Sequence, residues 1–117
     1  MELIIHEQKN GKVAELRSDI VLRNIEDFVD LIGNANYLDA ARIVIRESNL
    51  PPDFLDLKTK VAGEILQKFS TYDQKLSIIG DFSNIESKSL RDFIRESNEI
   101  GRIVFTNSKE EAFAGSV

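Results

Sequence analysis

Carboxylate, hydroxyl and basic side chains follow the apolar runs in the second half of the chain. Their types suit the binding of a small polar ligand or of a charged segment of a protein partner. If the apolar runs are parallel strands, these side chains share the sheet edge where strands end and helices begin. A structural alternative makes Asp56, Ser87 and Ser89 helix caps, and Asp81 and Arg91 a local ion pair. The candidate binding residues are Glu47, Asn49, Asp53, Phe54, Lys58, Thr59, Asp81, Ser83, Ser89 and Arg91.

Catalytic chemistry has weaker support in the residue pattern. A carboxylate pair such as Glu47 and Asp81 could act as general acid and base, as in glycosidases. With 20 acidic residues in 117, however, such pairs arise by chance. His6 is the single histidine, there is no cysteine, and no motif for phosphate binding, nucleophilic hydrolysis or zinc proteolysis occurs. We therefore expect no catalytic residue, no metal and no cofactor.

Two large apolar residues, Phe54 and Leu55, follow the rigid pair Pro51-Pro52 beside the candidate residues. If their side chains are exposed, they form the kind of anchor that protein interfaces use. If they fold back, they fix the start of the next helix. The sequence leaves both alternatives open.

The first elements are a hairpin and a helix. Short apolar runs at residues 3–7 and 12–17 flank Asn10-Gly11, which predicts a type I′ turn and an antiparallel hairpin. From Asn24, apolar residues recur at helical spacing, with Asn24 placed as the N-cap and the helix fading over residues 33–36. Residues 41–47 then contain an unbroken apolar row, which is typical of a central strand covered on both faces.

The rest of the chain alternates helices and strands. A second helix is predicted after Pro51-Pro52 and extends to about residue 70. Strands follow at 75–80 and 102–106. A third helix, capped by Ser87 or Asn84, lies between them, and a capping box at Ser108 begins a last helix through residue 114. The order β-β-α-β-α-β-α-β-α predicts one α/β domain over residues 1–117, with a mixed sheet of about five strands and right-handed crossovers.

The second helix has a clear division between buried and exposed positions. Val61, Ala62, Ile65 and Phe69 form its expected buried stripe, and Gly63 is expected close to another backbone or at a partner-facing spot. On the solvent side, the helix offers a candidate partner face of charged residues. That face consists of Lys60, Glu64 and Lys68.

Charge and hydropathy restrict the classes of partner. The net charge of -5 argues against nucleic acid or an anionic membrane as the main partner. No basic segment precedes an apolar one at the start, and no apolar run reaches the length of a membrane span, so we expect a cytoplasmic protein without a signal peptide.

Residues 53–98 carry a specific resemblance. The segments DLKTKVAGEILQKFSTY, IIGDFS and SKSLRDFIRESN resemble an uncharacterised bacterial family of domains of unknown function (4180). The resemblance spans essentially the whole chain. It implies a small single-domain bacterial protein and supplies no activity or catalytic residue.

The order of elements is also similar to that of the STAS superfamily, the fold of anti-sigma-factor antagonists. The final SKEEAF segment resembles the SVEEAL-like ending of those proteins. The resemblance implies a regulatory domain that binds protein partners and is switched by phosphorylation of a serine at the start of the second helix. When TKVAGEIL is set against their SSGLGVLL-like pattern, Thr59 matches the first hydroxyl and Lys60 occupies the phosphorylated position, so the ordinary phospho-switch is not expected.

These observations favour a non-enzymatic α/β module that binds a protein partner, or a second copy of itself, through the second-helix region. The alternative is a domain, with or without enzymatic activity, that binds a small polar ligand or phosphate through the strand-end cluster. An apolar patch around Phe54 would favour the first function. A concave pocket enclosing Asp81 and Lys58 would favour the second.

Overall fold

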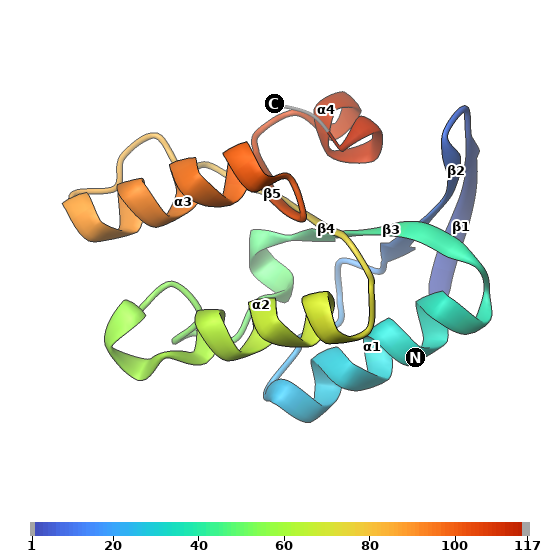
Figure 1. Ribbon diagram of the computed structural model, residues 1–117, viewed down its shortest axis with the longest axis horizontal. Coiled ribbons are helices and arrows are strands. Elements are labelled where there is room, and N and C mark those ends of the chain that lie inside the picture. The colour runs from blue at the N-terminus through green and yellow to red at the C-terminus, as the bar shows by residue number, and fades with distance from the viewer. Residues whose placement is uncertain (1, 116–117) are drawn as a thin grey trace.

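A twisted five-stranded sheet organises the computed structural model, which describes residues 2–115 (Figure 1). The strands follow one another in chain order across the sheet; only the first pair is antiparallel. The predicted mixed α/β sheet is confirmed, and the apolar row of residues 43–45 lies in its central strand. The strands are β1 (Leu3–Gln8), β2 (Gly11–Leu16), β3 (Ala40–Arg46), β4 (Leu76–Ile79) and β5 (Ile103–Thr106).

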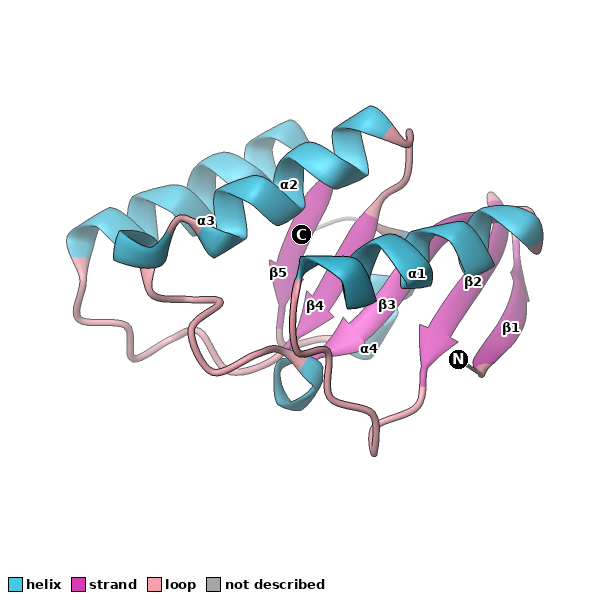
Figure 2. Ribbon diagram, turned by 90° about the horizontal axis from the view of Figure 1, so that it is seen from below, coloured by secondary structure: helices cyan, strands magenta, loops and turns pink. Residues whose placement is uncertain are grey.

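Helices cover both faces of the sheet, but unequally. Because the parallel strands follow in chain order, successive right-handed crossovers place their connecting helices on one face. Figure 2 shows α1, α2 and α3 on that face and α4 behind the sheet. The helices are α1 (Ile25–Tyr37), α2 (Val61–Thr71), α3 (Lys88–Ile100) and α4 (Lys109–Ala114).

Strand periodicity divides the core between the two faces. Ile43 and Ile45 of β3 point to the main core beneath α1, α2 and α3, whereas Val44 points to a smaller cluster with Val13 and Ala112. Ile79 and Phe113 pack against this smaller cluster, and the second face also carries the polar side chains of Glu15, Arg42 and Ser77. The sheet therefore separates a large apolar layer from a smaller, mixed one.

Helix caps were well predicted. The side chains of Asn24, Ser87 and Ser108 each accept a hydrogen bond from the backbone N–H three residues later, which begins α1, α3 and α4. At Ser108 the predicted capping box is only half formed. The carboxylate of Glu111 instead accepts a hydrogen bond from the Thr106 hydroxyl at 2.9 Å.

The hairpin turn differs from the predicted type I′ turn. Gln8 pairs with Gly11, so the central turn residues are Lys9 and Asn10. Gly11 alone among these residues has a positive φ, +119°. A Cβ at Gly11 would also lie 3.0 Å from the Cβ of Ala41, so glycine permits both the turn and close packing against β3.

The second helix begins later than predicted. Residues 51–60 form a turn and a short 3₁₀ segment, Leu57–Thr59, capped by the side chain of Asp56. Lys60 then adopts a left-handed conformation with φ +65°, and α2 begins at Val61. The chain therefore changes direction at Lys60, and Pro51-Pro52 does not start the helix.

Gly63 lies on the exposed side of α2. No atom lies within 4 Å of the position that a Cβ would occupy, so the expected close approach to another backbone is wrong. Gly63→Ala should therefore raise the free energy of unfolding by about 0.5–1 kcal/mol, because alanine loses less backbone entropy on folding. Urea denaturation measures this change. Gly101→Ala is the control and should destabilise, because Gly101 has φ +85°; a loss of stability in Gly63→Ala would contradict the prediction.

Candidate functional site

The predicted strand-end residues are only partly brought together. The carboxylate of Asp81 accepts hydrogen bonds from the backbone N–H and the hydroxyl of Ser83, at 3.0 and 2.6 Å. Both hydrogen bonds lower the pKa of Asp81, and the bond from the Ser83 hydroxyl has the larger effect. Glu47 lies against the adjacent Gly80, since a Cβ there would come within 2.9 Å of the Glu47 Cβ. Glu47, Asp81 and Ser83 therefore share the carboxyl ends of β3 and β4, as predicted.

Lys58 and Thr59 belong to a separate local arrangement. The Thr59 hydroxyl donates to the backbone oxygens of Asp56 at 2.8 Å and Asp53 at 3.3 Å, and accepts a bond from Val61 N–H. Lys58 is exposed. The hollow around Asp81, about 350 Å³, is lined by the ends of β4 and β5 with α3 and α4, and it does not include Lys58. A pocket that encloses both Asp81 and Lys58 was expected to favour a ligand-binding function. This hollow includes Asp81 without Lys58, so it is not that pocket.

Asn49 is a structural residue rather than a binding residue. It is completely buried, and its Oδ1 accepts a hydrogen bond from Arg46 N–H at 2.7 Å. Its Nδ2 donates to the backbone oxygens of Arg17 and Ile20. Because every polar group of the side chain is used internally, Asn49 ties the end of β3 to the loop before α1 and cannot contact a ligand.

Phe54 folds back into the core. Its side chain is 1% exposed and stacks on Phe28 of α1, with ring centroids 6.1 Å apart. Phe54 therefore cannot form the exposed anchor considered above. It fixes the loop before α2 instead.

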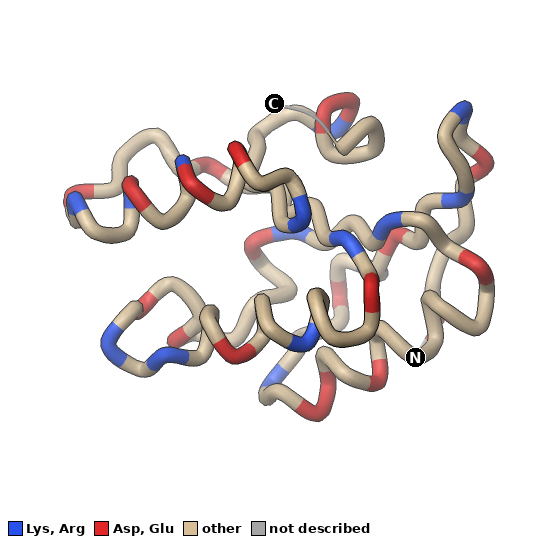
Figure 3. The backbone as a smooth tube through the Cα atoms, in the orientation of Figure 1, with Lys and Arg blue, Asp and Glu red and all other residues tan. Residues whose placement is uncertain are grey.

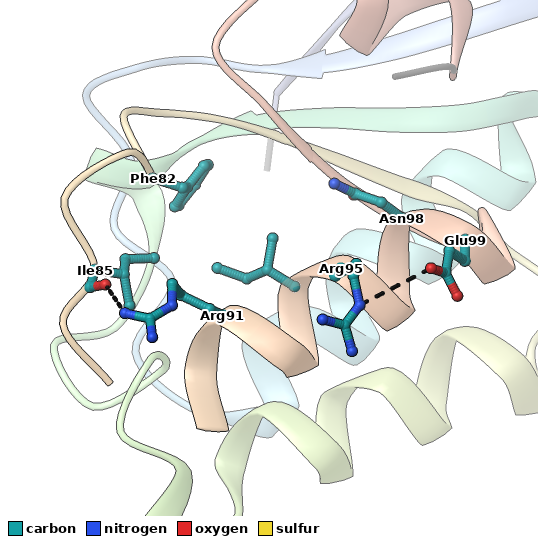
Figure 4. Close-up of a pocket in the computed structure, with 7 residues that line it drawn as sticks. Phe82, Ile85, Arg91, Arg95, Asn98 and Glu99 are labelled. Carbon is teal, nitrogen blue, oxygen red and sulfur yellow. Dashed lines mark hydrogen bonds and ion pairs between the residues drawn. The ribbon is translucent and has the colours of Figure 1, made fainter. Parts of the chain in front are cut away.

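Ser89 and Arg91 lie in the first turns of α3 and are exposed. Arg91 reaches back to the preceding loop, donating to the backbone oxygens of Ile85 at 2.9 Å and Glu86 at 3.0 Å (Figure 4). The ion pair with Asp81, which belonged to the structural alternative, is not formed. The guanidinium of Arg91 donates to these two carbonyl oxygens instead. Arg91 lines a separate open hollow of about 510 Å³ with Phe82 and other residues of α3.

The strongest polar cluster lies on the second face of the sheet and was not predicted. Glu15 of β2 is 7% exposed, and its Oε1 lies 2.8 Å from Nε2 of His6 on β1. Its Oε2 lies 2.9 Å from a guanidinium nitrogen of Arg46 on β3. Burial alone would raise the pKa of Glu15, but the hydrogen bonds from His6 and Arg46 and the charges of Arg46 and Lys109 outweigh it and lower the pKa. The carboxylate stays ionised and links three strands.

A weak signal for this cluster is present in the sequence. Glu15 interrupts the apolar run of β2, and Arg42 and Arg46 flank Val44 at every second position of β3. Charges at strand spacing indicate a polar sheet face. Which charges meet depends on the strand register, which no local pattern shows.

An apolar groove separates α2 from α3 on the helical face. Leu66 of α2 and Phe93 and Ile100 of α3 form its walls, and Ile103 of β5 also lines it. Its volume is about 520 Å³. Ile100 is 80% exposed at the end of α3, so the groove presents an uncovered aliphatic side chain to solvent.

Within residues 2–115, no helix is long and apolar enough to cross a membrane. The same part of the chain contains no group of three or more His, Asp or Glu side chains arranged to hold a metal ion.

Comparison with known proteins places the chain in a family. A family model matches residues 8–115, which includes the segments between residues 53 and 98 that carry the resemblance. No curated protein and no solved structure matches the chain significantly, so the similarity to STAS domains stays a prediction. Because the match covers nearly all of the sequence, the chain belongs to the family described as Domain of unknown function (DUF4180).

Proposed function

We propose that this protein is a non-enzymatic, cytoplasmic interaction domain that binds a protein partner through the groove between α2 and α3. The observation that carries the proposal is the apolar lining of this groove together with the exposed Ile100 at its rim. Exposed aliphatic side chains beside an apolar groove are typical of surfaces that bind a partner.

The groove fits an amphipathic helix. Two helices lying on a sheet form its walls, and a third helix can place an apolar stripe along such a groove, using residues spaced by three and four positions. Polar groups at the rim, Gln67 and Ser70 of α2 and Glu96 of α3, can bond the flanks of that helix. The net charge of -5 favours a partner helix with basic flanks, because complementary charge accelerates association.

The charged face predicted from the sequence is a second candidate surface on α2. Glu64 and Lys68 are four residues apart on α2 and so form a separate row from Leu66 and Ser70, and Lys60 is the N-cap residue of the helix. Lys60 and Glu64 are exposed and Lys68 is half-buried. The two surfaces can be altered independently.

Affinity purification from the source cells, followed by mass spectrometry, tests the proposal with two variants. Ile100→Asp should lose the partner, because a carboxylate would be desolvated against the apolar walls. The triple variant of Lys60, Glu64 and Lys68 to Ala should retain it. Thermal melts should match the wild type for Ile100→Asp, since position 100 is exposed.

Direct binding must then follow with purified components. An isolated helix from the captured partner should bind the wild type in calorimetry and bind Ile100→Asp at least tenfold more weakly. Loss of binding in the triple variant alone would move the interface to the charged face. Equal binding by all three proteins would refute a partner site on α2 and α3.

A further inference from the structure

A small polar pocket lies on the second face of the sheet, opposite the α2–α3 groove. Its volume is about 200 Å³. The amino ends of β3 and β4 form its floor, the β1–β2 turn forms one wall, and the end of α4 forms another. Its polar side chains are Gln8, Asn10, Arg42 and Lys75, and no acidic residue lines it.

Arg42 is a buried cation without a carboxylate partner in the described part of the chain. Arg42 is only 8% exposed, and this burial lowers the pKa of its guanidinium. One terminal nitrogen donates to Leu76 O at 3.2 Å and Ser77 Oγ at 3.0 Å, and the other donates to Gly101 O at 3.3 Å. Within residues 2–115, no carboxylate oxygen forms an ion pair with it, whereas Arg17, Arg46, Arg95 and Arg102 all have one.

One edge of the Arg42 guanidinium is only partly used by hydrogen bonds within the described chain. The carbonyl and hydroxyl acceptors occupy the terminal nitrogens, and Nε makes no hydrogen bond to the described chain. Gly115 lies directly over this edge, because a Cβ there would come within 2.5 Å of Nε. The edge formed by Nε and a terminal nitrogen is the one with which arginine binds an oxyanion through two parallel hydrogen bonds.

A second cation lies beside Arg42. Ile43 of β3 pairs with Leu76 of β4, so the preceding residues, Arg42 and Lys75, lie at the same level on adjacent strands. Lys75 is exposed, and its ammonium group carries no ion pair to the described chain. Figure 3 shows basic positions following one another along this part of the sheet. In a protein of net charge -5, this is a local concentration of positive charge.

We propose that this pocket binds a small tetrahedral oxyanion of the phosphate type. The Arg42 edge would bind two oxygens, the Lys75 ammonium would neutralise the remaining charge, and the amides of Gln8 and Asn10 would donate from the turn. A bound anion would also compensate the buried charge of Arg42, which is otherwise stabilised only by neutral acceptors. The volume admits one phosphate group, held free or as the end of a phosphate monoester.

NMR titration of the full-length protein tests this site. Inorganic phosphate and phosphoserine are added in separate experiments, with sodium chloride used to hold the ionic strength constant. Saturable shifts are expected at the backbone amides of Gly11 and Gly115 and at the Nε–H of Arg42. Lys75→Gln should weaken binding about tenfold, because one of the two cations is lost. Lys88→Gln removes another exposed lysine, outside the pocket, and should leave binding unchanged.

The outcomes separate the source of the anion from the existence of the site. Binding of phosphoserine equal to or tighter than that of phosphate would support a phosphorylated ligand. Binding of phosphate alone would support the free anion. The proposal is overturned if neither anion gives saturable shifts at these groups, or if Lys88→Gln weakens binding as much as Lys75→Gln. Because Lys75 lies outside the α2–α3 groove, this result is independent of partner binding.

Discussion

Phe54→Ala is expected to lower the free energy of unfolding by about 3–5 kcal/mol, the range for removing a buried aromatic ring from a close-packed core. The ring is fully buried and stacked on Phe28, so its loss removes apolar contacts on both sides and leaves a cavity. The loop before α2 has few other apolar residues to fill that space. Equilibrium denaturation in urea measures the loss, and the slope of the transition shows whether unfolding stays two-state.

Tyr37→Ala is the matched control. Tyr37 is also aromatic, but its side chain is 86% exposed at the end of α1, so its removal should change the free energy of unfolding by no more than about 0.5 kcal/mol. If Phe54→Ala were as stable as Tyr37→Ala, this result would contradict the packing of residues 51–60 against α1. The exposed-anchor alternative for Phe54 would then be restored.

The caps and the mixed sheet were predictable because they depend on local chemistry and on the alternation of elements along the chain. Asn24, Ser87 and Ser108 each satisfy an N–H group within the next three residues, so no distant contact is needed to place them. The alternation of strands and helices after residue 40 leaves few ways to form right-handed crossovers. The observed order from β1 to β5 is the simplest of them.

The start of α2 could not be predicted in this way. Leu57 lies four residues before Val61, so the apolar spacing predicts that the helix already includes Leu57. Proline also commonly begins a helix. Burial of Phe54 against Phe28 instead determines the path of the loop, and Lys60 absorbs the change of direction at φ +65°. A left-handed lysine has no sequence signature, because tertiary packing compensates the cost of about 1–2 kcal/mol.

The polar face of the sheet was missed for a related reason. His6, Glu15 and Arg46 come from three different strands, and they meet only because of the pairing register. Each residue taken alone resembles a solvated charge at the end of a strand. The strand-end residues Asp81 and Ser83, by contrast, were predicted together because they are two residues apart.

The two faces of the sheet suggest two kinds of recognition. The helical face has an apolar groove with an uncovered rim, which suits a macromolecular partner. The second face has a small pocket beside the buried Arg42 and the exposed Lys75, which suits a small anion. Chemical shifts of groove residues during the phosphate titration would measure any coupling between the sites.

Glu15→Gln is expected to lower the free energy of unfolding at pH 7 by about 1.5–3 kcal/mol, the range for hydrogen bonds to a charged group. Glutamine keeps the shape of the side chain but removes the negative charge that pairs with Arg46, leaving that guanidinium without its carboxylate in a half-buried position. Asp92→Asn is the control. Asp92 pairs with Lys88 and Arg95 on the surface of α3, so its replacement should change stability far less.

The pH dependence of this difference tests the cause. The pKa of Glu15 is lower in the folded protein than in the unfolded chain, where a glutamate titrates near about 4.3. Its stabilising contribution is therefore fully present above that unfolded value and is lost as pH falls through the lower folded pKa. Urea denaturation from pH 7 down to about pH 3 should show the wild type and Glu15→Gln converging at acid pH, because protonated glutamate also lacks the charge. A difference that stays constant over this range would show that it does not depend on the charge of Glu15, and that the ion pair with Arg46 contributes nothing measurable.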